Sequence, residues 1–406
     1  MEFDLQWLLI GLPLAFATGW LASRIDIRQL RRQRRDAPRA YFEGLNLLLN
    51  EQQDKAIDAF IEAVQNDPDT TELHFALGNL FRRRGEFERA VRVHEHLLRR
   101  GDLGAAERDR AQHALAQDFM KAGLFDRAEA AYRALEGTAF DGEARLALLS
   151  LYERSREWTQ AIAMAQRLEQ SGGGSFASRI AHYECERALQ ADAAGRSDDG
   201  DAALARARVV APAAARPLLL AGQRALKTGA YEVAMQAWGE LHERHPAEFL
   251  LVASAYVDAA RACGRLGPAR AVLSALHEQL PAVELLQALD ALDAAVAADT
   301  TAAGGAVGVA GAGAGASPGS ARWAEQLRRR PSLTAAQQWL AQIDSDDAGG
   351  LPAEGRAALQ EAVARAARPL QRYRCAACGF EAQHYFWQCP GCLSWDSYPP
   401  QRIDAL

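Results

Sequence analysis

The chain is poor in cysteine and carries little net charge of either sign. Six cysteines in 406 residues are too few for a disulfide scaffold, and a net charge of −6 argues against a nucleic-acid binder. No serine–histidine–acid, paired-carboxylate or phosphate-loop constellation stands out, so the sequence predicts a protein that is not an enzyme. Hydrophobic residues make up 49% and charged residues 24%, which is typical of a folded chain of two or three domains.

An uncharged stretch lies near the N-terminus. Leu5 to Ser23 contain 19 residues without a charged side chain, about the length that a helix needs to cross the hydrocarbon of a bilayer. Trp7 and Trp20 lie near its two ends, where indole rings favour the membrane interface. The sequence therefore predicts a transmembrane anchor over residues 1–23.

A basic juxtamembrane segment, residues 24–36, follows the anchor. It contains six arginines, at Arg24, Arg28, Arg31, Arg32, Arg34 and Arg35. Positively charged flanks remain in the cytoplasm, so we expect the N-terminus outside and the body of the protein in the cytoplasm. A cleaved signal peptide is the alternative, but its positive charges would precede the apolar run, and here they follow it.

A ladder of small and large residues recurs through the next part of the chain. In the first copy Gly44, Ala56, Phe60, Ala63 and Pro68 are separated by 12, 4, 3 and 5 residues. Seven copies begin 33 to 39 residues apart, at Gly44, Gly78, Ala116, Leu149, Ala188, Gly222 and Val257. This pattern resembles the tetratricopeptide repeat, a helix–turn–helix unit of about 34 residues.

The repeat resemblance implies an all-α superhelix over residues 37–300, with a concave face that holds peptides or proteins. We expect the first small residue to let two helices approach closely, and the large residue to fill the gap to the next pair. Gly123 and its counterparts would end the first helix of a pair in the left-handed conformation. Cys185 and Cys263 are interpreted as small buried hydrophobes, and the arginines at 82–84 as solvated helix ends.

Residues 301–320 interrupt the repeat pattern. Fourteen of these twenty residues are glycine or alanine and none is charged, which predicts a flexible insertion. It would separate a helix at 282–298 from a helix at 320–330 that would otherwise form another pair. Residues 321–370 are expected to form the C-terminal helices.

Residues 371–406 hold four of the six cysteines. Cys375 and Cys378 form one CxxC knuckle, and Cys389 and Cys392 form a second after ten intervening residues. Two knuckles in one short module predict a tetrahedral metal site with four thiolate ligands. The metal would supply the stability that about 30 residues cannot obtain from a core. Iron and zinc both accept this ligand set, so the spacing leaves the metal open.

Two disulfides or a thioredoxin-like redox pair are the alternatives to a metal. A cytoplasmic location disfavours structural disulfides, and the sequence lacks the βαβ context of a redox motif. We expect aromatic side chains to cover the ion and to dock on the last helix. These aromatic residues are Tyr373, Phe380, Tyr385, Phe386, Trp387 and Trp395.

The combination of an anchor, an arginine-rich segment, repeats and a terminal CxxCG…CPxC module is unusual. Together with the segments NEQQDKAIDAF, LGNLFRRRGEFERAVRVH and RYRCAACGF, it resembles the lipopolysaccharide assembly protein B family of Gram-negative bacteria. The resemblance spans the whole chain. It departs at the insertion 301–320, and at Leu393, where rubredoxins usually carry glycine.

The family resemblance implies a non-enzymatic adaptor that regulates lipopolysaccharide biosynthesis and assembly. It would be a single-pass protein of the cell inner membrane with a periplasmic N-terminus and a cytoplasmic body. Its implied partners are a membrane-bound ATP-dependent zinc protease and the lipid A pathway deacetylase whose proteolysis it promotes. The lipopolysaccharide transport machinery and lipopolysaccharide itself are further candidates. The resemblance also implies a rubredoxin-like iron site on Cys375, Cys378, Cys389 and Cys392, with zinc as the alternative.

Two other functions remain open from the residues alone. A rubredoxin-like electron carrier would use the same thiolates, but no flavin or nicotinamide fingerprint accompanies them. A generic membrane-tethered scaffold for protein–protein interaction would use the repeats. Binding of nucleic acid is disfavoured because residues 375–406 contain one arginine and no lysine. The sequence leaves the oligomeric state open, including a homodimer.

Overall fold

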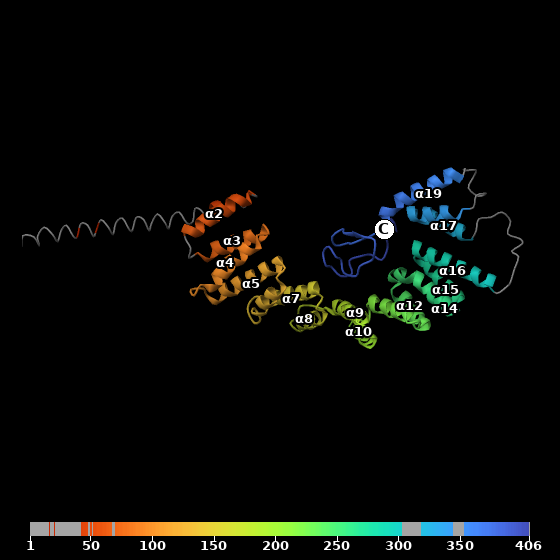
Figure 1. Cartoon of the computed structure of the whole chain (residues 1–406), viewed down its shortest axis with the longest axis horizontal. Helices are drawn as coiled ribbons and strands as arrows, with labels where there is room; N and C mark the ends of the chain where they lie inside the picture. The colour runs from red at the N-terminus through yellow and green to blue at the C-terminus, as the bar shows by residue number, and fades with distance from the viewer. Residues whose placement is uncertain are drawn as a thin grey trace, which may run out of the picture. The chain divides into compact units, whose positions relative to one another are not determined.

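The structure is a computed structural model. It describes Phe16, Trp20 and residues 42–47, 49–50, 52–66, 70–302, 318–343 and 353–405. These residues fall into two compact units, one that ends at Gly174 and one that begins at Ser175. Figure 1 labels many of the helices of both units and colours them in chain order.

Several predicted segments lie outside the described residues. They are the anchor, apart from Phe16 and Trp20, the basic segment 24–36, and residues 303–317 of the insertion. Within the described part of the chain, no helix is both long and apolar enough to cross a bilayer.

The first unit consists of helices that pack on their neighbours in the chain. Their bounds are α2 Gln53–Asn66, α3 Thr71–Arg83, α4 Phe87–Arg99, α5 Ala105–Ala122, α6 Phe125–Arg133, α7 Asp141–Ser155 and α8 Trp158–Gln170. The alternation of helices and short turns follows the ladder of the sequence, as a tetratricopeptide repeat predicts.

The ladder positions explain how these helices pack. The second small position is fully buried wherever it is alanine in this unit, at Ala56, Ala90, Ala128 and Ala161. At the first small position, a Cβ added to Gly78 would come within 2.5 Å of the His94 ring, and one added to Gly44 within 2.9 Å of Phe60. The large residue therefore packs against the first helix of its own pair, where the missing glycine side chain leaves room. His94 also reaches the next pair, as we expected, because its Nδ1 lies 2.5 Å from the Asp118 carboxylate of α5.

The turns between paired helices use the left-handed conformation that the sequence predicted. Gly123 ends α5 with φ of 75°, where a residue with a Cβ would be strained. Arg156 occupies the equivalent place after α7 and has φ of 58°. The backbone geometry of the repeat is thus kept even where glycine is absent.

The second unit continues the pattern of paired helices. Its helices are α9 Ala177–Ala193, α10 Ser197–Val210, α11 Ala215–Lys227, α12 Tyr231–Arg244, α13 Pro246–Phe249, η1 Leu250–Val252, α14 Ala253–Ala262, α15 Leu266–Gln279, α16 Val283–Ala302, α17 Pro318–Arg329, α18 Leu333–Gln342, α19 Ala353–Ala367 and η2 Arg368–Leu370. A side chain at Gly222 would overlap the indole of Trp238, which is fully buried and donates from Nε1 to the Leu219 carbonyl at 3.2 Å.

The pairing of helices survives the Gly/Ala-rich insertion. Trp323 of α17 is fully buried, and its Nε1 donates to Asp290 of α16 at 2.6 Å. Arg322 pairs with Asp290 and Asp293 of the same helix. The insertion therefore does not separate these two helices, because a buried tryptophan and two ion pairs join them.

The chain ends in a small module of β and irregular structure. Strands β1 Tyr373–Arg374 and β2 Glu381–Ala382 pair antiparallel, with Tyr373 opposite Ala382. An isolated bridge joins Gln388 and Trp395, and a short helix, η3 Ile403–Ala405, follows. So little regular structure gives the module few backbone hydrogen bonds, which makes its cysteines the natural source of its stability.

Candidate metal centre

The two CxxC knuckles have the same backbone geometry. In the first, the Gly379 N–H donates to the Cys375 carbonyl at 2.9 Å, and in the second, the Leu393 N–H donates to the Cys389 carbonyl at 2.8 Å. The Cys375 N–H donates to the Phe380 carbonyl, and the Cys389 N–H donates to the carbonyl five residues later, each at 2.9 Å. Each knuckle is thus a tight turn that fixes where its two sulfur atoms lie.

The residue after each second cysteine adopts the left-handed conformation. Gly379 has φ of 78° and Leu393 has φ of 61°. Leucine in this region carries a backbone penalty of roughly 1–2 kcal/mol that glycine escapes. The knuckle keeps its shape despite Leu393, which indicates that the surrounding contacts impose it.

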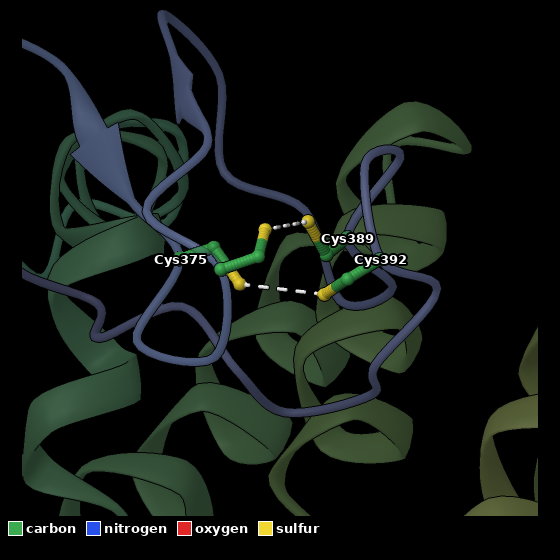
Figure 2. Close-up of side chains that lie close together, drawn as sticks. Cys375, Cys389 and Cys392 are labelled. Atoms are coloured by element: carbon green, nitrogen blue, oxygen red, sulfur yellow. Dashed lines mark hydrogen bonds between the residues drawn. The ribbon is translucent and has the colours of Figure 1, made fainter. Parts of the chain in front are cut away.

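The four cysteine sulfur atoms converge on one point. Cys375 Sγ lies 3.8 Å from Cys392 Sγ, and Cys378 Sγ lies 3.7 Å from Cys389 Sγ (Figure 2). All four sulfur atoms lie within 4.8 Å of one another. A tetrahedral ion with metal–sulfur bonds of about 2.3 Å requires sulfur atoms about 3.8 Å apart, whereas a disulfide requires about 2.05 Å. The separations fit a metal and exclude disulfides, and all four thiols are free.

The cysteine cluster is buried on one side only. Cys375 and Cys389 are buried, whereas Cys378 and Cys392 are exposed. The hydroxyl of the buried Tyr398 lies 3.8 Å from Cys389 Sγ and donates to the Phe380 carbonyl. An ion held here would be shielded from water by the protein on one side and be reachable from the other.

The thiols influence one another strongly. Burial acts to raise the pKa of Cys375, but hydrogen bonds with the Ser397 hydroxyl and with backbone N–H groups lower it to about 6. The Phe380 N–H acts to lower the pKa of Cys378, but burial and the neighbouring thiols raise it to about 12. The Ser394 side chain lowers the pKa of Cys392. Four thiolates at these distances repel one another, and a cation removes that repulsion.

The metal module docks on α9 through Trp395 and the residue that follows it. The Trp395 ring stacks on the His182 ring, with centroids 4.7 Å apart and planes 19° apart. His182 Nε2 lies 2.9 Å from an Asp396 carboxylate oxygen, and the Ser178 hydroxyl donates to the same oxygen at 3.3 Å. Burial acts to raise the pKa of Asp396, but the bonds from His182 and Ser178 hold it below its usual value.

The second docking contact is made with α11. The Arg216 guanidinium lies 5.7 Å from the Trp387 ring and 5.8 Å from the Trp395 ring. Arg216 is 5% exposed and donates to Glu186 at 2.5 Å. Our prediction that these tryptophans dock on the last helix was wrong, because buried His182 and Arg216 give their rings flat polar partners on α9 and α11.

The C-terminal tail makes a contact that the sequence analysis missed. The Asp404 carboxylate accepts hydrogen bonds from the N–H groups of Leu333, at 3.2 Å, and Thr334, at 2.7 Å. These groups begin α18, where a negative charge satisfies free N–H donors and the helix dipole. The position of Asp404, about 70 residues from its partners, gives no signal in the sequence.

Three residues that we interpreted within the repeats have mixed outcomes. Cys185 is fully buried, as predicted, whereas Cys263 is half-buried at the end of α14. Arg82 is not a solvated helix end. It donates to the fully buried Asp118 at 2.7 Å, and its side chain is 18% exposed.

Comparison with known families accounts for both parts of this architecture. The family model for the rubredoxin metal binding domain matches residues 373–399, and the tetratricopeptide repeat model matches residues 73–106. Lipopolysaccharide assembly protein B of Escherichia coli strain K12 is 32% identical over 99% of this chain and 100% of its own length. The chain belongs to the lipopolysaccharide assembly protein B family. The predicted resemblance is therefore confirmed.

Two further proteins are similar to this chain over different lengths. The lipopolysaccharide assembly protein B of Haemophilus influenzae is 27% identical, with 98% of each chain covered. A tetratricopeptide repeat protein from Parabacteroides merdae has a solved structure that is 13% identical, covers 63% of this chain and 98% of its own, and gives a TM-score of 0.32. The protein is a repeat scaffold with a four-cysteine metal site.

Proposed function

We propose that the protein is a non-enzymatic, metal-bearing adaptor that regulates lipopolysaccharide biosynthesis at the inner membrane. In this proposal it promotes proteolysis of the lipid A pathway deacetylase by a membrane-bound ATP-dependent zinc protease. Full-length similarity to lipopolysaccharide assembly protein B supports the pathway, and the paired helices support a role in holding other proteins. The protease and the deacetylase themselves follow from the family resemblance alone.

The metal site is the observation that carries the proposal. Cys375, Cys378, Cys389 and Cys392 would bind one ion, because their sulfur atoms already have the spacing of a tetrahedral thiolate site. We assign iron as the resident metal and keep zinc as the alternative, since both accept four thiolates. The ion would act structurally, by holding the two knuckles together.

The docking contacts explain why an adaptor would carry a metal. Trp387, Trp395 and Asp396 lie beside the second knuckle and contact His182 and Arg216 of the repeats. The ion would fix the loop that presents these side chains. Metal loading would then decide whether the module stays on α9 and α11, and so which surface a partner meets.

The membrane anchor completes the proposed arrangement. We assign residues 1–23 to a single span, residues 24–36 to the cytoplasmic membrane surface and the repeats to the cytoplasm. The support is the uncharged run from Leu5 to Ser23 and the arginines that follow it. Tethering would confine adaptor, protease and substrate to one plane and raise their effective concentration.

The test uses cells that lack their own family member and produce this chain. Changing both Cys375 and Cys378 to serine should remove the bound metal and lengthen the half-life of the deacetylase several-fold. The control is Cys263→Ser, which alters a half-buried thiol outside the cluster and should leave both measurements unchanged. A deacetylase half-life that does not respond to the double substitution would exclude the proposed role of the metal site.

A truncation tests the anchor separately. A chain that starts at residue 24 should keep its metal and its helical content but should restore deacetylase turnover poorly, because tethering is lost. Full restoration by the truncated chain would remove any role for the anchor while leaving the metal site untouched.

A further inference from the structure

A cavity of about 440 Å³ lies between α11 and the metal module. Its first wall is a stripe of α11 formed by Arg216, Leu219, Leu220 and Gln223, whose spacing of three, one and three residues places them on one helix face. Its volume lies within the range of about 300–1,000 Å³ that is typical of ligand pockets.

The metal module and the C-terminal tail form the opposite wall of this cavity. Gln383, His384, Tyr385 and Trp387 lie on the loop that leads to the second knuckle. Arg402 lies just before η3. The cavity therefore exists only where the module and the repeats meet, within the second unit.

The charge of the lining favours a negatively charged ligand. None of the described residues that line the cavity is acidic, whereas Arg216 and Arg402 are cationic. Arg216 is already matched, because its Nη2 donates to Glu186 at 2.5 Å. Arg402 also has a carboxylate partner, Glu284, but at 3.7 Å this pairing is the weaker of the two. Arg402 is therefore the cation of the lining that is more open to a ligand.

The partner of Arg402 within the protein is weak. Its Nε lies 3.7 Å from the nearest Glu284 oxygen, beyond hydrogen-bond distance, and has no hydrogen-bond partner. The Glu284 side chain is 14% exposed, and one of its own oxygens lacks a partner. The Arg402 side chain is 36% exposed, and its guanidinium carbon lies 5.8 Å from the Tyr373 ring. Part of the side chain is thus open to a carboxylate from outside.

The remaining lining residues narrow the class of ligand. Leu219, Leu220 and Trp387 offer apolar contacts, while the amides of Gln223 and Gln383 can bond to peptide groups. One weakly paired guanidinium suits a single carboxylate, whereas a dianionic phosphate would leave a charge without a partner. We propose that this cavity binds a peptide segment in which an acidic residue lies beside an aromatic one. This inference deepens the proposed adaptor function, on which it rests, by naming the kind of partner segment that the protein would hold.

The test uses the full-length, metal-loaded chain in detergent and a fluorescein-labelled peptide, Gly-Gly-Phe-Glu-Phe-Glu-Gly-Gly. Fluorescence anisotropy should show that it binds at least about tenfold more tightly than the same peptide with glutamine in place of glutamate. A hydrogen bond to a charged group contributes about 1.5–3 kcal/mol, or at least about tenfold in affinity. Arg402→Gln should therefore lower the affinity for the acidic peptide by at least about tenfold.

Two further variants separate a binding role of Arg402 from a structural one. Glu284→Gln removes the carboxylate that competes for Arg402 and should raise the affinity for the acidic peptide several-fold. A variant that merely lost structure would not bind more tightly. Arg330→Gln is the matched control. Arg330 lines a second cavity of about 470 Å³ that also contains Asp404, and this variant should bind like the wild type.

Three results would overturn the inference: equal binding of the acidic and glutamine peptides, unchanged binding by Arg402→Gln, or displacement of the peptide by inorganic phosphate at equal concentration. The same preparations distinguish this inference from the proposed function. If the acidic peptide binds as described but the cysteine double variant leaves deacetylase turnover unchanged, the cavity stands and the adaptor function fails. If turnover responds and the peptide shows no preference, the adaptor function stands and the cavity assignment fails.

Discussion

A buried ion-pair cluster joins three successive helices of the first unit, and its removal should have a large local effect. Asp118 of α5 is completely buried. One of its oxygens accepts a hydrogen bond from Arg82 of α3 at 2.7 Å, and the other lies 2.5 Å from Nδ1 of His94 of α4. His94 is also fully buried, and its Nε2 has no hydrogen-bond partner. The Asp118 carboxylate therefore compensates the polar groups of both His94 and Arg82.

The substitution Asp118→Ala leaves the buried His94 and the half-buried Arg82 without their carboxylate. Breaking a buried ion pair by removing one partner costs about 3–5 kcal/mol. The Arg82 side chain is 18% exposed and keeps a bond to the Ala114 carbonyl at 3.1 Å, so we expect the low end, about 3 kcal/mol. In a repeat array this loss stays local.

Hydrogen exchange measured by mass spectrometry provides the assay, because it reports local opening. Amides of α3, α4 and α5 should exchange about a hundredfold faster in the variant, as about 3 kcal/mol implies. Amides of α11 to α15 should not change. Glu88→Ala removes a carboxylate whose side chain is 93% exposed and serves as the control. Acceleration of less than about threefold in α3 to α5 would refute the reasoning.

Two further predictions concern single positions in the second unit. Leu393→Gly should stabilise the metal-loaded module by about 0.5–1 kcal/mol, because removing the backbone penalty of the left-handed conformation outweighs the entropy cost of glycine. The variant should then release its metal to a chelator more slowly than the wild type. Faster release would contradict this prediction. Burial raises the pKa of Glu284, so its ionisation disfavours the folded state above about pH 4.5. Glu284→Gln should therefore raise the melting temperature at pH 7, and that gain should disappear as the pH falls below about 4.5; a gain that is equal at both pH values would show that ionisation is not its cause.

The helical part of the fold follows from the sequence because its packing is local. Ala90 is buried and Gly123 ends its helix because a helix pair repeats the same contacts every 33 to 39 residues. The metal site of the two knuckles was predicted from the sequence for a similar reason, since the same CxxC spacing gives both knuckles the same turn. Even the strain at Leu393 had a signal, because leucine stands where the first knuckle has Gly379.

The contacts that the sequence did not predict are those between distant or unusual partners. Trp395 and His182 stack across more than 200 residues of chain, and nothing near His182 marks it as a docking residue. Asp118 lies two residues after a ladder position and looks like an ordinary surface carboxylate, yet it is buried because His94 and Arg82 compensate it. Such sites depend on which helices contact one another in the fold. Neither the repeat period nor the amino-acid composition predicts those contacts.

The central claim is that four thiolates hold one ion at the end of the repeat scaffold. X-ray absorption at the metal edge of the purified full-length protein tests it most directly, combined with elemental analysis. We predict one iron or zinc ion per chain, surrounded by four sulfur atoms at about 2.3 Å. A first shell dominated by nitrogen or oxygen, or a metal-free chain whose cysteines are joined by sulfur–sulfur bonds of about 2.05 Å, would contradict the claim.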